Sequence, residues 1–246
     1  MTETHPALQT PGNISEKVII ALDVSTAAEA EEIVEDLRGQ VGAFKIGLQL
    51  YTAEGPSIVR RFTSSGIQIF LDLKFHDIPN TVARAAAEAA KLGVWMFNVH
   101  ASGGEEMMRT TTESVDEVCN NEGITRPLII GVTVLTSMND AGLNSVGIAG
   151  GADDQVLRLA RLAAAAGLDG VVASPLEAPR LRSEIDTRDL CVVTPGIRGV
   201  SATTNDQKRV TTVRGALANG ADYAVIGRPV VQAADRKSAL DEMLSQ

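Results

Sequence analysis

Residues 69–81 read Ile69-Phe70-Leu71-Asp72-Leu73-Lys74-Phe75-His76-Asp77-Ile78-Pro79-Asn80-Thr81. The first part of this stretch is typical of a strand buried on both faces, because apolar residues occupy alternating positions on each side. Asp72 and Lys74 are two residues apart and therefore point to the same face of the strand. Burying an acid and an ammonium is costly unless they are paired. Pro79 stands where a helix could begin, so we expect chemistry at the carboxyl end of this strand.

Two other apolar segments carry single charges in comparable positions. Residues 18–24 form an apolar run with Asp23 near its end, and residues 43–47 form another that contains Lys45. A structural ion pair is the ordinary interpretation of an isolated Asp-x-Lys. Two acids and two lysines on predicted buried strands instead indicate one functional cluster.

Apolar strands and amphipathic helices alternate from end to end of the chain. Strands are expected at residues 18–24, 43–47, 67–75, 95–101, 127–135, 170–174, 191–196 and 223–227. The clearest helices are expected at residues 26–38, 79–92, 155–166 and 206–218. Eight strands alternating with helices over 246 residues predict an α/β protein with a single (β/α)8 TIM barrel. An open doubly wound sheet is the main alternative, but no G-x-G-x-x-G follows the first strand, which weakens its dinucleotide-binding form.

Composition disfavours several classes of protein. The net charge is −9 and only 3% of residues are aromatic, so we expect no nucleic-acid partner. No apolar run approaches the roughly 18 residues that span a membrane. Cys119 and Cys191 provide neither a disulfide framework nor metal-ligand spacing, which favours a reducing cytoplasm and no metal site. Residues 1–17 are polar and are predicted to be a flexible tail before a barrel domain at residues 18–246.

The segments after the last two strands predict a phosphate site. They read Thr194-Pro195-Gly196-Ile197-Arg198-Gly199 and Ile226-Gly227-Arg228-Pro229. In TIM barrels the loops after strands seven and eight commonly hold phosphate. Each segment offers glycine for close backbone approach and an arginine for a planar grip on the anion.

These motifs, in this order, resemble the bacterial orotidine 5′-monophosphate decarboxylase family from about residue 18 to the end. The segment from Asp72 to Thr81 matches the signature of that family throughout. Five further segments fall in family order: Ala21-Leu22-Asp23, Phe44-Lys45-Ile46-Gly47, Leu135-Thr136-Ser137 and the two arginine segments quoted above. The resemblance implies decarboxylation of orotidine 5′-monophosphate (orotidylate) to uridine 5′-monophosphate (uridylate), with no metal and no organic cofactor.

The resemblance also implies roles for the charged cluster. Lys74 would donate a proton to C6 of the pyrimidine, and Asp72 would lie beside the substrate carboxyl group. Lys45 would bridge the acids and contact the ribose, and Asp23 would bind a ribose hydroxyl.

The remaining implied site residues bind the other parts of the nucleotide or serve a second subunit. The resemblance places Thr136 at the base and leaves open whether Ser137 shares that contact. It implies a homodimer in which Asp77 and Thr81 reach the active site of the neighbouring chain. The expected phosphate and closing-loop residues are Pro195, Arg198, Gln207, Gly227 and Arg228, with residues 199–207 as a lid.

Two alternatives remain at this point. One is a metal-dependent keto-sugar-phosphate lyase on the same barrel, in which an acid for the metal would replace Lys45. The other is a catalytically silent nucleotide-binding barrel, which would have no need of Lys74 between two acids.

Overall fold

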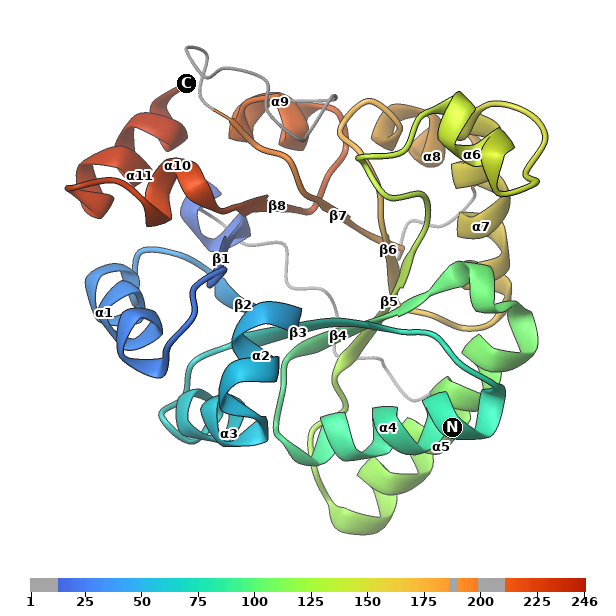
Figure 1. The fold of residues 1–246 in the computed structure, drawn as a ribbon, viewed down its shortest axis with the longest axis horizontal. Helices are drawn as coiled ribbons and strands as arrows, with labels where there is room; N and C mark the ends of the chain where they lie inside the picture. The colour runs from blue at the N-terminus through green and yellow to red at the C-terminus, as the bar shows by residue number, and fades with distance from the viewer. Residues whose placement is uncertain (1–12, 186–189, 199–210) are drawn as a thin grey trace.

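The computed structural model describes residues 13–185, 190–198 and 211–246. Across these residues eight parallel strands close into a barrel in chain order, surrounded by helices (Figure 1). The strands are β1 (Val18–Ala21), β2 (Ala43–Gly47), β3 (Ile69–Phe75), β4 (Met96–His100), β5 (Leu128–Val132), β6 (Gly170–Val172), β7 (Cys191–Thr194) and β8 (Tyr223–Ile226). The predicted TIM barrel is therefore confirmed.

The helices lie between the strands and after the last of them. The α-helices are α1 (Ala27–Leu37), α2 (Leu48–Glu54), α3 (Pro56–Ser64), α4 (Pro79–Lys91), α5 (Glu105–Glu122), α6 (Asp140–Ser145), α7 (Ala152–Ala165), α8 (Ala178–Glu184), α9 (Val213–Ala218), α10 (Arg228–Val231) and α11 (Arg236–Ser245). Two short 3-10 helices are η1 (Ile14–Lys17) and η2 (Ala101–Gly103). Helix η1 occupies the end of the segment predicted as a tail, whose residues 1–12 lie outside the described residues.

Several elements are shorter than the sequence predicts. Strand β1 ends at Ala21 and β5 at Val132. The next residue of each still donates to the neighbouring strand, Leu22 N–H to the Lys45 carbonyl at 2.9 Å and Thr133 N–H to the Val172 carbonyl at 3.3 Å, and the chain then enters the loops above the barrel. The helix expected at residues 206–218 begins only at Val213, where the side chain of Thr212 caps it by accepting from the Gly215 N–H. Residues 206–210 of that prediction lie outside the described residues.

The strands bury a different apolar cluster on each face. One cluster consists of strand residues such as Ile19, Phe70, Ile130 and Val193, which fill the inside of the barrel. The other combines the alternate strand positions with the helices. Because side chains alternate along a strand, a polar residue at an inward position must lie in the barrel core or at its mouth.

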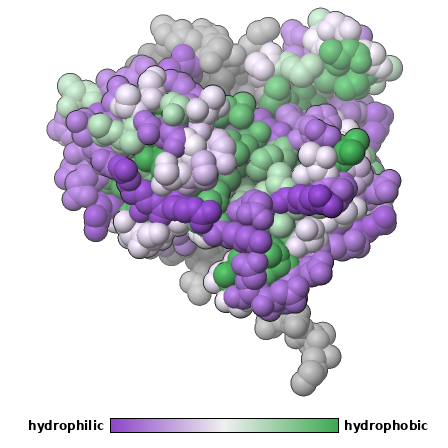
Figure 2. All heavy atoms as spheres, turned by 60° about the horizontal axis from the view of Figure 1, so that its bottom comes forward, coloured by the Kyte–Doolittle hydropathy of each residue, from purple (hydrophilic) through white to green (hydrophobic). Residues whose placement is uncertain are grey.

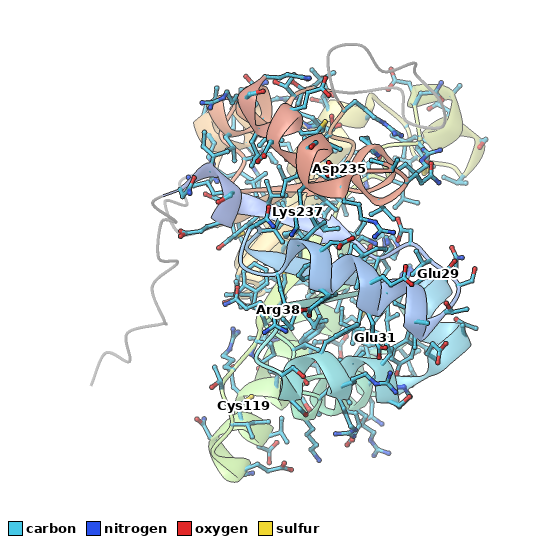
Figure 3. All side chains as sticks on the ribbon, turned by 90° about the vertical axis from the view of Figure 1, so that its left-hand side faces the viewer. Glu29, Glu31, Arg38, Cys119, Asp235 and Lys237 are labelled. Carbon is cyan, nitrogen blue, oxygen red and sulfur yellow. The ribbon has the colours of Figure 1, made fainter. Side chains whose placement is uncertain are left out.

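Helix α1 illustrates how the outer layer attaches to the strands. Its buried residues, Ala30, Ile33, Val34 and Leu37, recur at helical spacing and form one stripe. Thr26 and Glu29 form a capping box at its start, each side chain accepting from the backbone N–H of the other. Figure 3 shows Glu29, Glu31 and Arg38 along this helix, with its charged side chains away from the apolar stripe.

The outer surface around α3, α4 and α5 is mostly hydrophilic, with small hydrophobic patches between the charged side chains (Figure 2). Of the helices that the structure describes, none is both long enough and apolar enough to cross a membrane.

Two equivalent clamps join neighbouring strands at their amino ends, opposite the mouth where Asp72 and Lys74 lie. Asp169 Oδ2 accepts from the Ile129 N–H and from Arg126 Nη1, both at 2.7 Å. Asp222 Oδ2 likewise accepts from the Val192 N–H at 2.7 Å and pairs with Arg182. Each carboxylate thus joins two neighbouring strands through a hydrogen bond to the backbone and an ion pair. We therefore assign these charges a role in stabilising the fold.

We expect Asp169→Ala to lower the free energy of unfolding by about 3 kcal/mol, because it leaves the largely buried Arg126 without its main partner. Arg161→Ala is the matched control: it removes an exposed pair with Glu184 and should cost less than about 1 kcal/mol. Urea unfolding measures both. Equal losses in the two variants would contradict the clamp.

Candidate active site

Strands β1 to β4 deliver one set of polar side chains to the mouth of the barrel. Lys45 lies in β2, Asp72 and Lys74 in β3, and Asp23 two residues beyond the end of β1. All four line one cavity of about 520 Å³. They share the inward-facing parity of their strands, so the alternation that fills the core below them also directs them into this cavity.

The four charged groups form one chain of alternating sign. Lys45 Nζ lies 3.1 Å from Asp23 Oδ1 and 3.2 Å from Asp72 Oδ2. Lys74 Nζ lies 2.6 Å from Asp72 Oδ1. The Asp72 carboxylate therefore contacts one ammonium through each oxygen. The structure thus brings together the four residues that the sequence predicts as one cluster.

Asn98 of β4 joins this network, and the sequence analysis missed it. Its Nδ2 donates to Asp72 Oδ1 at 2.7 Å, while its Oδ1 accepts from the backbone N–H of Lys74 at 2.8 Å. The residue is 1% exposed. An amide at an inward position between apolar residues of the strand was the available signal, since buried polar groups need partners.

The backbone of Lys74 is unusual. Its φ of 52° is the one positive value found for a residue other than glycine in the described chain. This left-handed conformation costs a non-glycine residue about 1–2 kcal/mol. The pairing of β3 with β4 is irregular at the same place, between Leu71 and Phe75.

Burial and ion pairing shift the pKa values of the two most buried charged groups in opposite directions. Burial alone would lower the pKa of Lys45, but the carboxylates of Asp72 and Asp23 outweigh it and raise that pKa. Burial alone would raise the pKa of Asp72, but Lys45 and Lys74, with the Asn98 hydrogen bond, lower it. Both groups therefore remain charged near neutral pH.

Gly47 leaves room for the Lys45 ammonium. A Cβ at this position would lie 3.1 Å from Lys45 Nζ and 3.4 Å from Asp23 Oδ1. The sequence analysis quoted this glycine within a motif but assigned it no role. Its lack of a side chain lets the backbone pass close to the ion pair.

The rest of the cavity is apolar on one side and basic at the rim. The apolar wall comes from β5 to β8 and their ends: Val132, Val134, Val172, Val193 and Val225. The rim includes the other predicted substrate residues that line the cavity: Thr136, Ser137, Pro195, Arg198, Gly227 and Arg228. Arg198 is anchored through its backbone N–H, which donates to the Thr211 carbonyl at 3.0 Å.

Two predicted site residues do not line this cavity, and a third lies outside the described residues. Asp77 and Thr81 are exposed at the start of α4 and do not line it. Gln207 and the predicted lid at 199–207 fall in a part of the chain that the structure does not describe.

His76 and His100 lie together beside the cluster, with ring centroids 5.3 Å apart. Burial, with the charges of His76 and Lys74, lowers the pKa of His100. Within residues 13–185, 190–198 and 211–246, no three His, Cys, Asp or Glu side chains converge as a metal site would need.

Comparison with known proteins shows to which family the chain belongs. The sequence model of the orotidine 5′-phosphate decarboxylase / HUMPS family matches residues 16–243. The chain belongs to this family.

Individual relatives match the chain along almost its whole length. Proteins named orotidine 5′-phosphate decarboxylase from Syntrophotalea carbinolica and Geobacter sulfurreducens are each 50% identical, over 94% of this chain and 94% and 95% of their own. A solved structure of orotidine 5′-phosphate decarboxylase from Lactobacillus acidophilus is 36% identical with a TM-score of 0.80, covering 93% of this chain and 97% of that one.

We expect the Asp72 carboxylate to make stability depend on acid pH. Because its pKa is lowered by folding, its stabilisation is present above the ordinary carboxyl pKa of about 4 and is lost as pH falls through the lower folded value. Wild type should therefore lose unfolding free energy more steeply than Asp72→Asn on acidification below about pH 4. Urea titrations at stepped pH measure this. Parallel curves for the two proteins would contradict the lowered pKa.

Proposed function

We propose that this chain decarboxylates orotidylate to uridylate, a step of pyrimidine biosynthesis. The observation that carries the proposal is the Asp72 carboxylate held between two ammonium groups, beside an apolar wall, in a member of this family. Lys74 is the more exposed of the two lysines, with 30% of its side chain accessible against 10% for Lys45. Lys74 is therefore the cation better placed to reach a ligand.

The proposed reaction balances without a cofactor. The bond between C6 and the carboxyl carbon breaks, carbon dioxide leaves, and the electron pair remains on C6. The Lys74 ammonium stabilises this charge as it develops and then donates its proton to form the C6–H bond. The resulting neutral amine regains a proton from solvent.

The other members of the cluster hold Lys74 in place. Asp72 accepts from its ammonium at 2.6 Å, and Lys45 balances the second oxygen of the same carboxylate. Asp72 would face the substrate carboxylate, so like charges would meet in the ground state and separate as carbon dioxide leaves. Asp23, with 55% of its side chain exposed, is available to bind a ribose hydroxyl.

The opposite end of the cavity suits the phosphate and the base. Arg198 and Arg228 at the rim are the proposed phosphate ligands, since guanidinium groups bind phosphate with two hydrogen bonds. The valine wall would pack against the flat pyrimidine, with Thr136 beside it. Gln207 is proposed as a further phosphate contact.

Lys45 argues against the metal-dependent alternative. Its ammonium lies between Asp23 and Asp72, where it already neutralises the carboxylates that a divalent cation would need. A catalytically silent nucleotide-binding barrel would not need an ammonium held as closely as that of Lys74. A cytoplasmic location is in keeping with the two cysteines, which are buried and unbridged.

The test is the loss of ultraviolet absorbance as orotidylate becomes uridylate, with and without a chelator. We expect wild type to turn over equally in both conditions. Lys74→Ala should fold and still bind uridylate but lose nearly all turnover, because the lysine acts on charge that develops in the transition state. Substantial kcat in Lys74→Ala would remove its role as proton donor. Loss of wild-type activity on chelation would contradict the metal-free mechanism, and no absorbance loss in either condition would favour the lyase or the silent barrel.

We also propose a homodimer with shared active sites, in which Asp77 and Thr81 serve the neighbouring chain. Their exposure at the start of α4, away from the cavity of their own chain, supports an intermolecular role. In a twofold dimer each site would take residues from both chains.

Mixed dimers test this arrangement. Lys74→Ala and Asp77→Ala homodimers should each be nearly inactive. After joint unfolding and refolding in equal amounts, about half of the dimers are mixed, and each has one intact site, so activity should recover to about a quarter of wild type. No recovery despite demonstrated subunit exchange would place Asp77 in the site of its own chain.

A further inference from the structure

Three residues of β3 lie opposite a single residue of β4. Leu71 pairs with Phe97 and Phe75 pairs with Val99, so Asp72, Leu73 and Lys74 face Asn98 alone. A bulge of this kind removes ladder hydrogen bonds and turns the strand locally. Here it falls on the two charged residues of β3, which suggests that the irregularity serves the site.

The side chain of Asn98 replaces the missing ladder bonds. Its Oδ1 accepts from the backbone N–H of Lys74 at 2.8 Å, and its Nδ2 donates to the Asp72 carboxylate at 2.7 Å. One amide therefore holds the backbone of the lysine and the carboxylate that its ammonium contacts. An amide suits this task because it carries a donor and an acceptor side by side and has no charge.

The geometry points to Asn98 as a positioning residue that selects the left-handed backbone conformation of Lys74 and thereby aims its ammonium at the substrate. This inference rests on the proposed function, since it assigns Lys74 the reacting role. The lysine at φ 52° is in a conformation that residues other than glycine rarely adopt. Without the Asn98 carbonyl, the backbone would be free to relax, and the ammonium would move with it.

Two substitutions separate the hydrogen bonds from the space that Asn98 fills. Asn98→Leu keeps a similar volume but makes neither bond. Asn98→Asp keeps an acceptor for the Lys74 N–H and places a second carboxyl next to Asp72. Two carboxyls at this distance share a proton as the pH falls, which restores a donor between them. The other charged or titratable groups around the position are Lys45 and Lys74, which contact Asp72, then Asp23 beyond Lys45, and the His76–His100 pair beside the cluster.

We expect Asn98→Leu to lower kcat at least about 100-fold while KM for orotidylate changes less than about fivefold, because misalignment affects mainly the transition state. The kcat of Asn98→Asp relative to wild type should rise as the pH is lowered, whereas that of Asn98→Leu should stay at a constant low fraction. A purely structural role would produce no such difference.

Val99→Ala is the matched control, because Val99 is the next residue of β4, is fully buried and belongs to the cluster between strands and helices. It should lower the melting temperature and leave kcat unchanged. Wild type is assayed first, so failure to decarboxylate orotidylate would overturn the proposed function itself.

With an active wild type, two results would overturn the positioning role of Asn98. One is a kcat for Asn98→Leu within about threefold of wild type. The other is an equal loss in both variants at every pH. If Asn98→Leu does not fold, the pH profile of Asn98→Asp is the remaining test. A relative kcat that does not rise as the pH falls would then overturn the positioning role.

Discussion

The site depends on one carboxylate shared by two lysines. Asp72 is 9% exposed and would be costly to bury alone, yet each of its oxygens meets an ammonium. Removing Asp72 would leave Lys45 with Asp23 alone and would take from Lys74 the carboxylate that its ammonium contacts, so the cluster depends on this one group. The closed barrel makes this possible, because adjacent parallel strands hold Lys45 and Asp72 at a fixed separation that no loop would maintain.

Much of this could be predicted from the sequence. Alternating apolar strands and helices predicted the barrel, and the charges at Asp23, Lys45, Asp72 and Lys74 predicted a cluster that the structure brings into one cavity. Periodicity carries this information because both the strand repeat and the helix repeat are local properties of the chain. Strand ends were less well predicted, since the apolar character of β1 and β5 continues past the last residue of each strand into the loops.

Asn98 shows what local patterns cannot reveal. Its importance lies in a register shift between β3 and β4, and register is a relation between two segments 24 residues apart. The left-handed backbone of Lys74 is equally invisible, because nothing in the residue type of a lysine predicts it. The same limit applies to Gly47, whose role is apparent only once Lys45 Nζ is found 3.1 Å from its missing side chain.

The division of the cavity walls has an evolutionary consequence. The Asp-Lys network comes from the first half of the chain, on β2, β3 and the segment after β1, whereas the valines and the two rim arginines come from the second half, on β5 to β8 and the segments that follow them. Reactivity and shape selection are thus encoded in separate stretches of sequence. Substitutions among the valines could therefore change the shape of the cavity while the ion pairs of the Asp-Lys network stay intact. The shape of the cavity and the charge at its base can thus vary independently along the chain.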